Sequence, residues 1–151
     1  MKYNPYILTV LTQLIEIAAS PATNTTTIQK ESLFALANTE RAKVGLKPLI
    51  ENSALNKLAV IKSKDMVENN YFSHTSPNYG SVFNMMIAHG ISYFIAGENL
   101  AINQYADDVH TAWMNSKTHR ENILNSNFRE IGIGIYRKGN NSYAYTQLFI
   151  A

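Results

Sequence analysis

The chain contains four histidines and no cysteine. The histidines are therefore the first candidates for metal binding or proton transfer. Without cysteine there is no disulfide, no thiolate metal ligand and no thiol nucleophile. His74 stands in residues 72–80, an irregular segment rich in Ser, Thr, Pro and Gly, and functional residues concentrate in such loops. His119 stands at the start of a predicted short helix. The positive end of that helix lowers an imidazole pKa, favouring the neutral form that binds metal or accepts a proton.

The other two histidines are expected to have structural roles. His89 directly precedes Gly90 at a predicted helix end, and His110 lies three residues before Trp113, beside the predicted core. No H-E-x-x-H spacing of a zinc protease occurs. Ser73 and Ser76 flank His74, but their surroundings lack the sharp turn that exposes a hydrolase nucleophile.

Composition and charge narrow the class of protein. A length of 151 residues suits one domain, and 46% hydrophobic with 16% charged residues is normal for a globular core. The 13 basic and 11 acidic residues give a net charge of only +2. Basic residues are scattered along the chain, so no nucleic-acid partner is expected.

The N-terminal segment bears on the compartment. Residues 6–19 are mostly apolar after Lys2, and small residues follow at 20–22, which predicts a signal peptide and secretion. The run is too short and too polar for a transmembrane anchor. The alternative is an amphipathic helix that stays packed on the domain. Residues 23–27 are interpreted as a polar linker, so that 1–27 forms an extension and 28–151 the domain.

Residue patterns beyond the linker predict an α+β domain with helices covering an antiparallel sheet. Thr27 is the expected N-cap of the first helix, and Thr118 opens an expected capping box with Glu121. Residues 91–95 are β-prone. The predicted helices cover 28–44, 53–69, 82–89, 106–115 and a short segment from 118, and the predicted closing hairpin covers 130–136 and 143–150.

Six short segments occur in an order that resembles bacterial CAP domains, the cysteine-rich secretory protein, antigen 5 and pathogenesis-related superfamily. The resemblance covers about residues 28–151. It implies a three-layer α-β-α sandwich, an extracellular or cell-wall location, and a large cleft holding two histidines and two acidic residues. The segments are Asn38–Ala42 with Gly45–Leu49, Phe72–His74, Gly97–Ala101, Trp113–Ser116 with His119–Leu124, Ile131–Gly134 and Tyr145–Gln147.

Residue by residue, the resemblance places three cleft residues here: His74, Glu98 and His119. The second acid of animal members falls on Ser116, a departure that weakens any mechanism taken from the wider family. Asn99 is expected to orient Glu98. Tyr145 and Gln147 are expected to support the sheet or the cleft wall.

Two imidazoles and one carboxylate suit Zn²⁺ or another divalent cation with an open water position. We therefore expect a secreted, monomeric binding or interaction module rather than an enzyme. Its cleft ligand would be a peptide, a lipid or a cell-wall component. The alternatives are a metal-assisted hydrolase acting on peptide or peptidoglycan, a lipid-binding protein, and a structural domain with a vestigial site.

Overall fold

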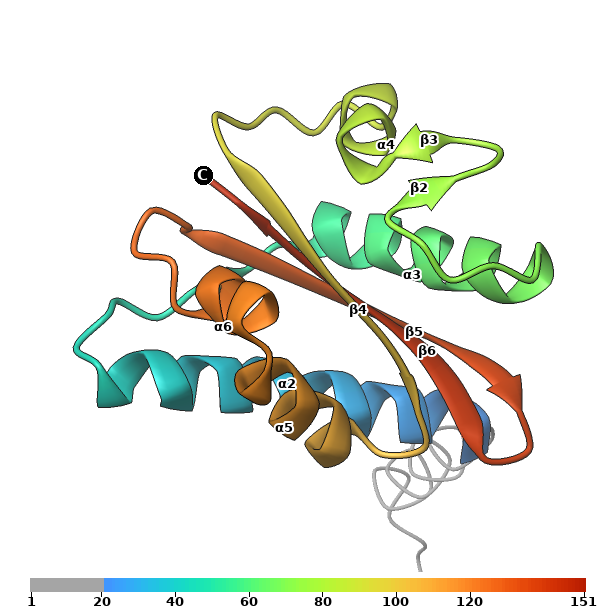
Figure 1. Ribbon diagram of the computed structural model, residues 1–151, viewed down its shortest axis with the longest axis horizontal. Coiled ribbons are helices and arrows are strands. Elements are labelled where there is room, and N and C mark those ends of the chain that lie inside the picture. Colours follow the sequence, from blue (N-terminus) through green and yellow to red (C-terminus); the bar gives the residue numbers. More distant parts are fainter. Residues whose placement is uncertain (1–20) are drawn as a thin grey trace, which may run out of the picture.

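The computed structural model describes residues 21–151, in three layers (Figure 1). A central sheet lies between α3 and α4 on one side and α2, α5 and α6 on the other, which confirms the predicted sandwich. The predicted signal peptide lies outside the described residues. The helices are α2 (Pro21–Lys43), α3 (Ser53–Glu68), α4 (Val82–Ala88), α5 (Ala106–Asn115) and α6 (Lys117–Ile123). The strands are β1 (Ile50–Glu51), β2 (Thr75–Ser76), β3 (Gly80–Ser81), β4 (Ala96–Asn103), β5 (Glu130–Gly139) and β6 (Ser142–Ile150).

The main sheet has the strand order β1-β5-β6-β4. β5 and β6 form the predicted closing hairpin, β4 pairs antiparallel with β6 at one edge, and the two-residue β1 pairs parallel with β5 at the other. β2 and β3 form a separate two-stranded ribbon in the loop that carries His74. β4, which carries Glu98, is therefore an edge strand.

Side chains alternate between the two faces of the sheet, as they must in a pleated strand. Along β6, Tyr145 and Phe149 belong to the cluster with Trp113 of α5, whereas Leu148 and Ile150 pack with residues of α3 and α4. The alternation Ile-Gly-Ile-Gly in β5 follows the same rule. Ile131 and Ile133 fill the α2/α5/α6 side.

The glycines of β5 allow α3 to approach the sheet closely. A Cβ at Gly134 would lie 2.0 Å from the backbone nitrogen of Val60, and one at Gly132 would lie 2.2 Å from Leu55 Cβ. Any side chain at these positions would push α3 away from the sheet. Glycine is thus required by backbone contact between a helix and a strand.

A buried cation fixes the far end of α2. Arg41, 1% exposed, donates from its guanidinium to the carbonyls of Lys47, Ile123 and Asn125. The guanidinium thus supplies hydrogen bonds to backbone carbonyls that follow the ends of α2 and α6. The role of Arg41 is therefore structural.

Three local predictions were wrong. Residues 23–27 are helical, so α2 extends back to Pro21 and Thr27 is not its N-cap. Residues 91–95 form no strand, because β4 begins at Ala96. The N-cap of α6 is Ser116 and makes no side-chain capping bond, so Thr118 opens no capping box. The positive φ of Gly45 (74°) and Gly90 (70°) agrees with the predicted helix ends.

Candidate functional site

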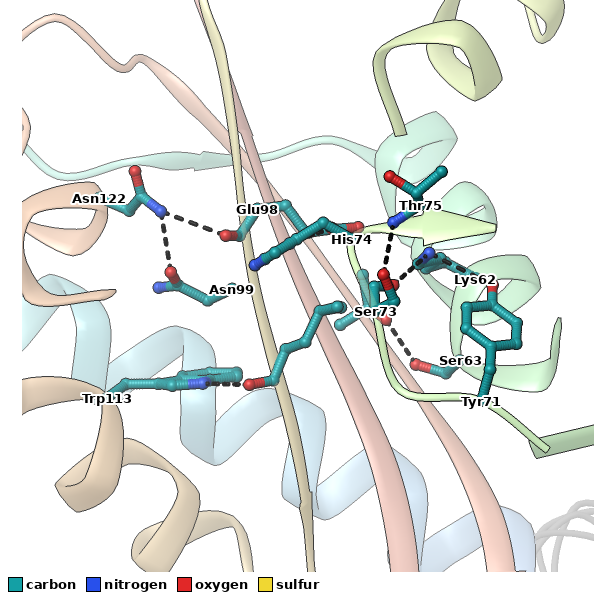
Figure 2. Close-up of polar contacts among 12 residues, drawn as sticks. Lys62, Ser63, Tyr71, Ser73, His74, Thr75, Glu98, Asn99, Trp113 and Asn122 are labelled. Carbon is teal, nitrogen blue, oxygen red and sulfur yellow. Dashed lines mark hydrogen bonds and ion pairs between the residues drawn. The ribbon is translucent and has the colours of Figure 1, made fainter. Parts of the chain in front are cut away.

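His74 and Glu98 form the centre of the candidate site (Figure 2). His74 Nδ1 lies 2.6 Å from Glu98 Oε1. The Glu98 side chain is 3% exposed and the His74 side chain is 64% exposed. A buried carboxylate thus holds an imidazole whose other face meets solvent.

The sheet register explains why the Glu98 side chain lies on the α3/α4 face of the sheet. Glu98 pairs with Leu148, whose side chain packs against α3 and α4, so Glu98 shares that face. His74 reaches the same face from the loop that follows α3 and leads into β2. Of the three expected cleft residues, the structure thus brings His74 and Glu98 into direct contact.

Burial raises the pKa of Glu98 above its ordinary value, while the hydrogen bond from His74 and the charge of Lys62 act in the opposite direction. Its second oxygen, Oε2, is buried and has no hydrogen-bond partner among the described residues. Glu98 is therefore a buried acceptor that the protein leaves half satisfied, and such a group favours a further donor.

Beneath this pair lies a lysine that sequence analysis missed. Lys62 of α3 is 0% exposed, and its ammonium donates to the Ser73 carbonyl (2.8 Å) and the Tyr71 hydroxyl (3.2 Å). Burial lowers the pKa of Lys62, and the charges of Glu98 and Asp65 oppose that shift. The pattern of α3 could have placed Lys62 on its buried face, because Leu55, Leu58 and Ala59 precede it at helical spacing.

Asp65, one turn further along α3, anchors the same loop. Its carboxylate accepts from Tyr71, from Ser76 Oγ (2.6 Å) and from Asn69 Nδ2 (2.7 Å). Burial opposes ionisation of Asp65, but these hydrogen bonds together hold its pKa below the ordinary value. Lys62 and Asp65 thus fix residues 71–76 from below.

His119 approaches the site from the other side of β4. Its side chain on α6 is half-buried. Burial lowers the pKa of His119, and the charge of His74 lowers it further. The predicted direction is correct, but burial and His74 account for it rather than the helix end. Among the described contacts, its ring bonds neither His74 nor Glu98.

An amide chain joins the α6 side of the sheet to the site. Asn99 Nδ2 donates to the His119 carbonyl (3.1 Å) and to Gln147 Oε1 (3.0 Å). Asn122 Nδ2 donates to Asn99 Oδ1 (2.8 Å) and to the Glu98 carbonyl (3.2 Å). Asn99 and Gln147 therefore position His119 and Asn122, and Asn99 does not touch the Glu98 carboxylate.

Asn122 is a second residue that sequence analysis did not single out, although it lies in the quoted His119–Leu124 segment. The indole of Trp113 plays a similar part further along β4, since it donates to the Leu100 carbonyl at 3.0 Å. Side chains of α5 and α6 thus bond carbonyls of the edge strand.

Ser116 and Tyr145 lie away from the His74–Glu98 pair. Ser116 is the N-cap of α6, and its nearest side-chain partner is Thr118 Oγ1 at 3.4 Å. Tyr145 is fully buried on the α2 side of the sheet, where its hydroxyl donates to Gln29. Tyr145 supports the sheet, whereas neither residue lines the hollow beside Glu98.

That hollow has a volume of about 390 Å³. Its lining mixes polar and apolar side chains and includes no lysine or arginine. His119 is not among the lining residues, which are His74, Thr75, Ser81, Val82, Phe83, Ala96, Gly97, Glu98 and Asn122.

The arrangement does not fit a three-ligand metal site. Within residues 21–151, no three His, Cys, Asp or Glu side chains are grouped so that they could hold a metal ion. The Nδ1 atom of His74 is already committed to Glu98. Binding of Zn²⁺ or another divalent cation stays a prediction.

Comparison with known sequences gives the family. The sequence model described as "CAP: Cysteine-rich secretory protein family" matches residues 34–149. YkwD of Bacillus subtilis is 49% identical over 141 residues, covering 88% of this chain. YlbC of the same organism, named a membrane protein, is 38% identical over 126 residues, covering 82% of this chain.

Comparison with solved structures also finds proteins of the same fold. An extracellular protein from Bacillus anthracis that contains an SCP domain has a TM-score of 0.77 and 35% identity, over 87% of this chain and 43% of that one. An outer surface protein from Borrelia burgdorferi has a TM-score of 0.77 at 24% identity, over 83% of this chain and 93% of that one, a likeness of fold alone.

The class that this fold and these motifs define is the α-β-α sandwich, and the chain belongs to the cysteine-rich secretory protein (CAP) family. It spans 54% of the length of YkwD and 35% of the length of YlbC. No helix of residues 21–151 is long and apolar enough to cross a membrane.

Proposed function

We propose that this chain is an extracellular binding module whose hollow beside His74 and Glu98 takes a polar ligand. One observation carries the proposal. A carboxylate that is 3% exposed bonds an imidazole that is 64% exposed at the wall of a cavity, and one of its oxygens has no partner within the described residues. The exposed imidazole of His74 is the group that a ligand in the cavity can reach, and the buried carboxylate behind it fixes its orientation.

The extracellular location is supported from two directions. The predicted signal peptide directs secretion. The Bacillus anthracis relative, 35% identical, is described as extracellular. We extend that location, and a cell-wall association, to this chain.

The lining indicates the ligand chemistry. Glu98 and His74 offer hydrogen-bonding groups, while Val82 and Phe83 offer a small apolar wall. A lipid tail gains mainly from continuous apolar burial, which a carboxylate at the wall opposes. A peptide or a peptide-bearing cell-wall fragment suits the mixed lining better.

A titration followed by NMR tests this function. Muramyl dipeptide and acetyl-tetraalanine amide are added separately to ¹⁵N-labelled protein, and phosphatidylglycerol vesicles serve as the lipid probe. We expect either soluble probe to shift the amide signals of His74, Thr75 and Glu98, and His74→Ala to abolish the effect. Cleft signals that respond to vesicles alone would overturn the peptide assignment. Signals that respond to none of the probes would overturn the binding role.

A second candidate, hydrolysis, is favoured by the His74–Glu98 hydrogen bond. A carboxylate on Nδ1 orients an imidazole so that Nε2 can accept a proton, as a general base requires. Release of dye from labelled peptidoglycan measures it. Turnover that His74→Ala and Glu98→Gln both abolish would establish the enzyme, and the same assay with added zinc tests the metal-assisted form.

A further inference from the structure

Lys62 is buried, although a lysine on α3 could lie in solvent. Its neighbour Lys64, two residues along α3, has a side chain 52% exposed and forms an ordinary surface pair with Glu68 at 3.9 Å. Lys62 is fully buried instead, although burying an ammonium carries a free-energy cost unless charge and hydrogen bonds offset it.

The hydrogen bonds of Lys62 go to the segment that carries His74. Its Nζ donates to the carbonyl of Ser73, the residue immediately before His74, at 2.8 Å. It also donates to the Tyr71 hydroxyl at 3.2 Å and lies 5.0 Å from the centre of that ring. Figure 2 shows the Lys62 ammonium between Tyr71 and the Ser73 backbone, behind the His74 loop.

The charge of Lys62 also acts on Glu98, the partner of His74. Two buried carboxylates, Glu98 and Asp65, interact with it electrostatically. Asp65 is saturated by hydrogen bonds from Tyr71, Ser76, Asn69 and Asn78, so it fixes the loop without needing the ammonium. Among residues 21–151, His74 alone bonds the Glu98 carboxylate, and its second oxygen has no partner there. The positive charge of Lys62 is therefore most consequential for the His74–Glu98 pair.

We infer that Lys62 is a positioning residue of the cleft, which holds the Ser73 carbonyl and attracts the Glu98 carboxylate through its charge, so that His74 Nδ1 stays bonded to Glu98. This rests on the proposed function, because it assigns Lys62 to the same hollow. A carboxylate can only accept. His74 therefore donates from Nδ1 and presents Nε2 to the ligand as an acceptor.

The test compares Lys62→Met, which keeps the aliphatic stem, with Lys64→Met as the matched control on the same helix. Long-range ¹H–¹⁵N spectra of histidine report which ring nitrogen carries the proton. In ligand-free protein near neutral pH, wild type and Lys64→Met are expected to carry it on Nδ1 of His74. Lys62→Met is expected to move it to Nε2, as in a free imidazole.

Lys62→Gln is measured beside it, because it keeps an N–H donor in the buried site without the charge. An unchanged His74 pattern in whichever of the two variants folds would overturn the inference. Muramyl dipeptide and acetyl-tetraalanine amide are then titrated into each variant, with at least severalfold weaker binding expected in the Lys62 variants alone. A moved proton with no probe binding in wild type would sink the proposed function and leave the positioning role standing.

Discussion

The two faces of the central sheet differ in how their buried apolar side chains are grouped. On the α2/α5/α6 face, one continuous cluster of aromatic and aliphatic residues surrounds Trp113 and Phe149. On the α3/α4 face, the apolar residues fall into two smaller clusters, and Lys62, Asp65 and Glu98 are buried beside them. The first face buries polar side chains too, among them Arg41, Asn99 and His110, but its apolar cluster is the larger, and the second face carries the His74–Glu98 pair.

Contacts between α3 and the sheet follow the same division. Ser63 Oγ donates to the Gly134 carbonyl (3.0 Å) and lies 2.8 Å from Thr146 Oγ1, so part of this interface is polar even at its centre. Fully satisfied polar contacts fix one arrangement, whereas apolar contacts slide more readily. The face that carries the site is therefore expected to be more rigid in register, although it has the smaller apolar clusters.

The largest expected effect lies on the apolar face. Trp113→Ala removes a side chain that is 1% exposed and leaves the Leu100 carbonyl without its indole donor. We expect the free energy of unfolding to fall by about 3–5 kcal/mol, measured by urea denaturation. Trp113→Phe, which keeps most of the ring, should lose clearly less. Equal losses would mean that the hydrogen bond, and not the burial, dominates.

The next effect lies on the other face. Gly134→Ala brings a Cβ to 2.0 Å from the Val60 nitrogen, a contact that only movement of α3 can relieve. We expect a loss of about 1–3 kcal/mol in urea denaturation. Gly139→Ala is the control, because a Cβ there meets no heavy atom within 4 Å. A destabilised control would show that strand propensity, rather than the approach of α3, sets the loss.

A pH effect is expected from the apolar face. Burial lowers the pKa of His110 below 6.5, and the charge of Glu40 opposes that shift. The unfolded chain therefore binds this proton more readily, so the stability that depends on neutral His110 is lost as pH falls through about 6.5.

The variant His110→Asn isolates this contribution. His119 acts in the same direction, and Glu98, whose pKa burial raises, acts in the opposite one. The drop in unfolding free energy between about pH 7.5 and about pH 5.5 should be smaller in His110→Asn than in wild type. An identical drop in both proteins would exclude His110 as a source of acid sensitivity.

The smallest effect belongs to neither face. Lys117 and Glu121 form a surface pair at 3.4 Å, with side chains 79% and 61% exposed. Lys117→Ala should change the free energy of unfolding by less than about 0.5 kcal/mol, because solvent screens such pairs. Thermal denaturation measures it. A larger change would mean that α6 is held mainly by its surface charges.

Periodicity predicted the order of elements well, and α5 has the predicted bounds of residues 106–115. The β-branched and aromatic residues at 91–95 favoured a strand there, and that prediction was wrong. Pairing with β6 makes residues 96–103 the strand, in spite of Gly97. The linker interpretation of 23–27 failed because local propensity is a weak guide when a longer helix can form.

Some features of the candidate site could likewise be predicted from the sequence, and others could not. The resemblance pointed to a cleft with His74, Glu98 and His119, and in the structure His74 and Glu98 are hydrogen-bonded whereas the His119 ring bonds neither among the described contacts. The burial of Lys62 is a tertiary event that its residue type argues against, since lysine is almost never fully buried. The separation of Glu98 from Asn99 onto opposite faces required knowing that both lie in a strand.

The edge of the sheet bears on self-association. An open edge strand is a template on which a second chain can add a strand and begin aggregation. Along β4, Asn122 and Trp113 already bond the Glu98 and Leu100 carbonyls, and at the opposite edge β1 offers only two residues. The side chains that bond these carbonyls thus also oppose strand addition along β4.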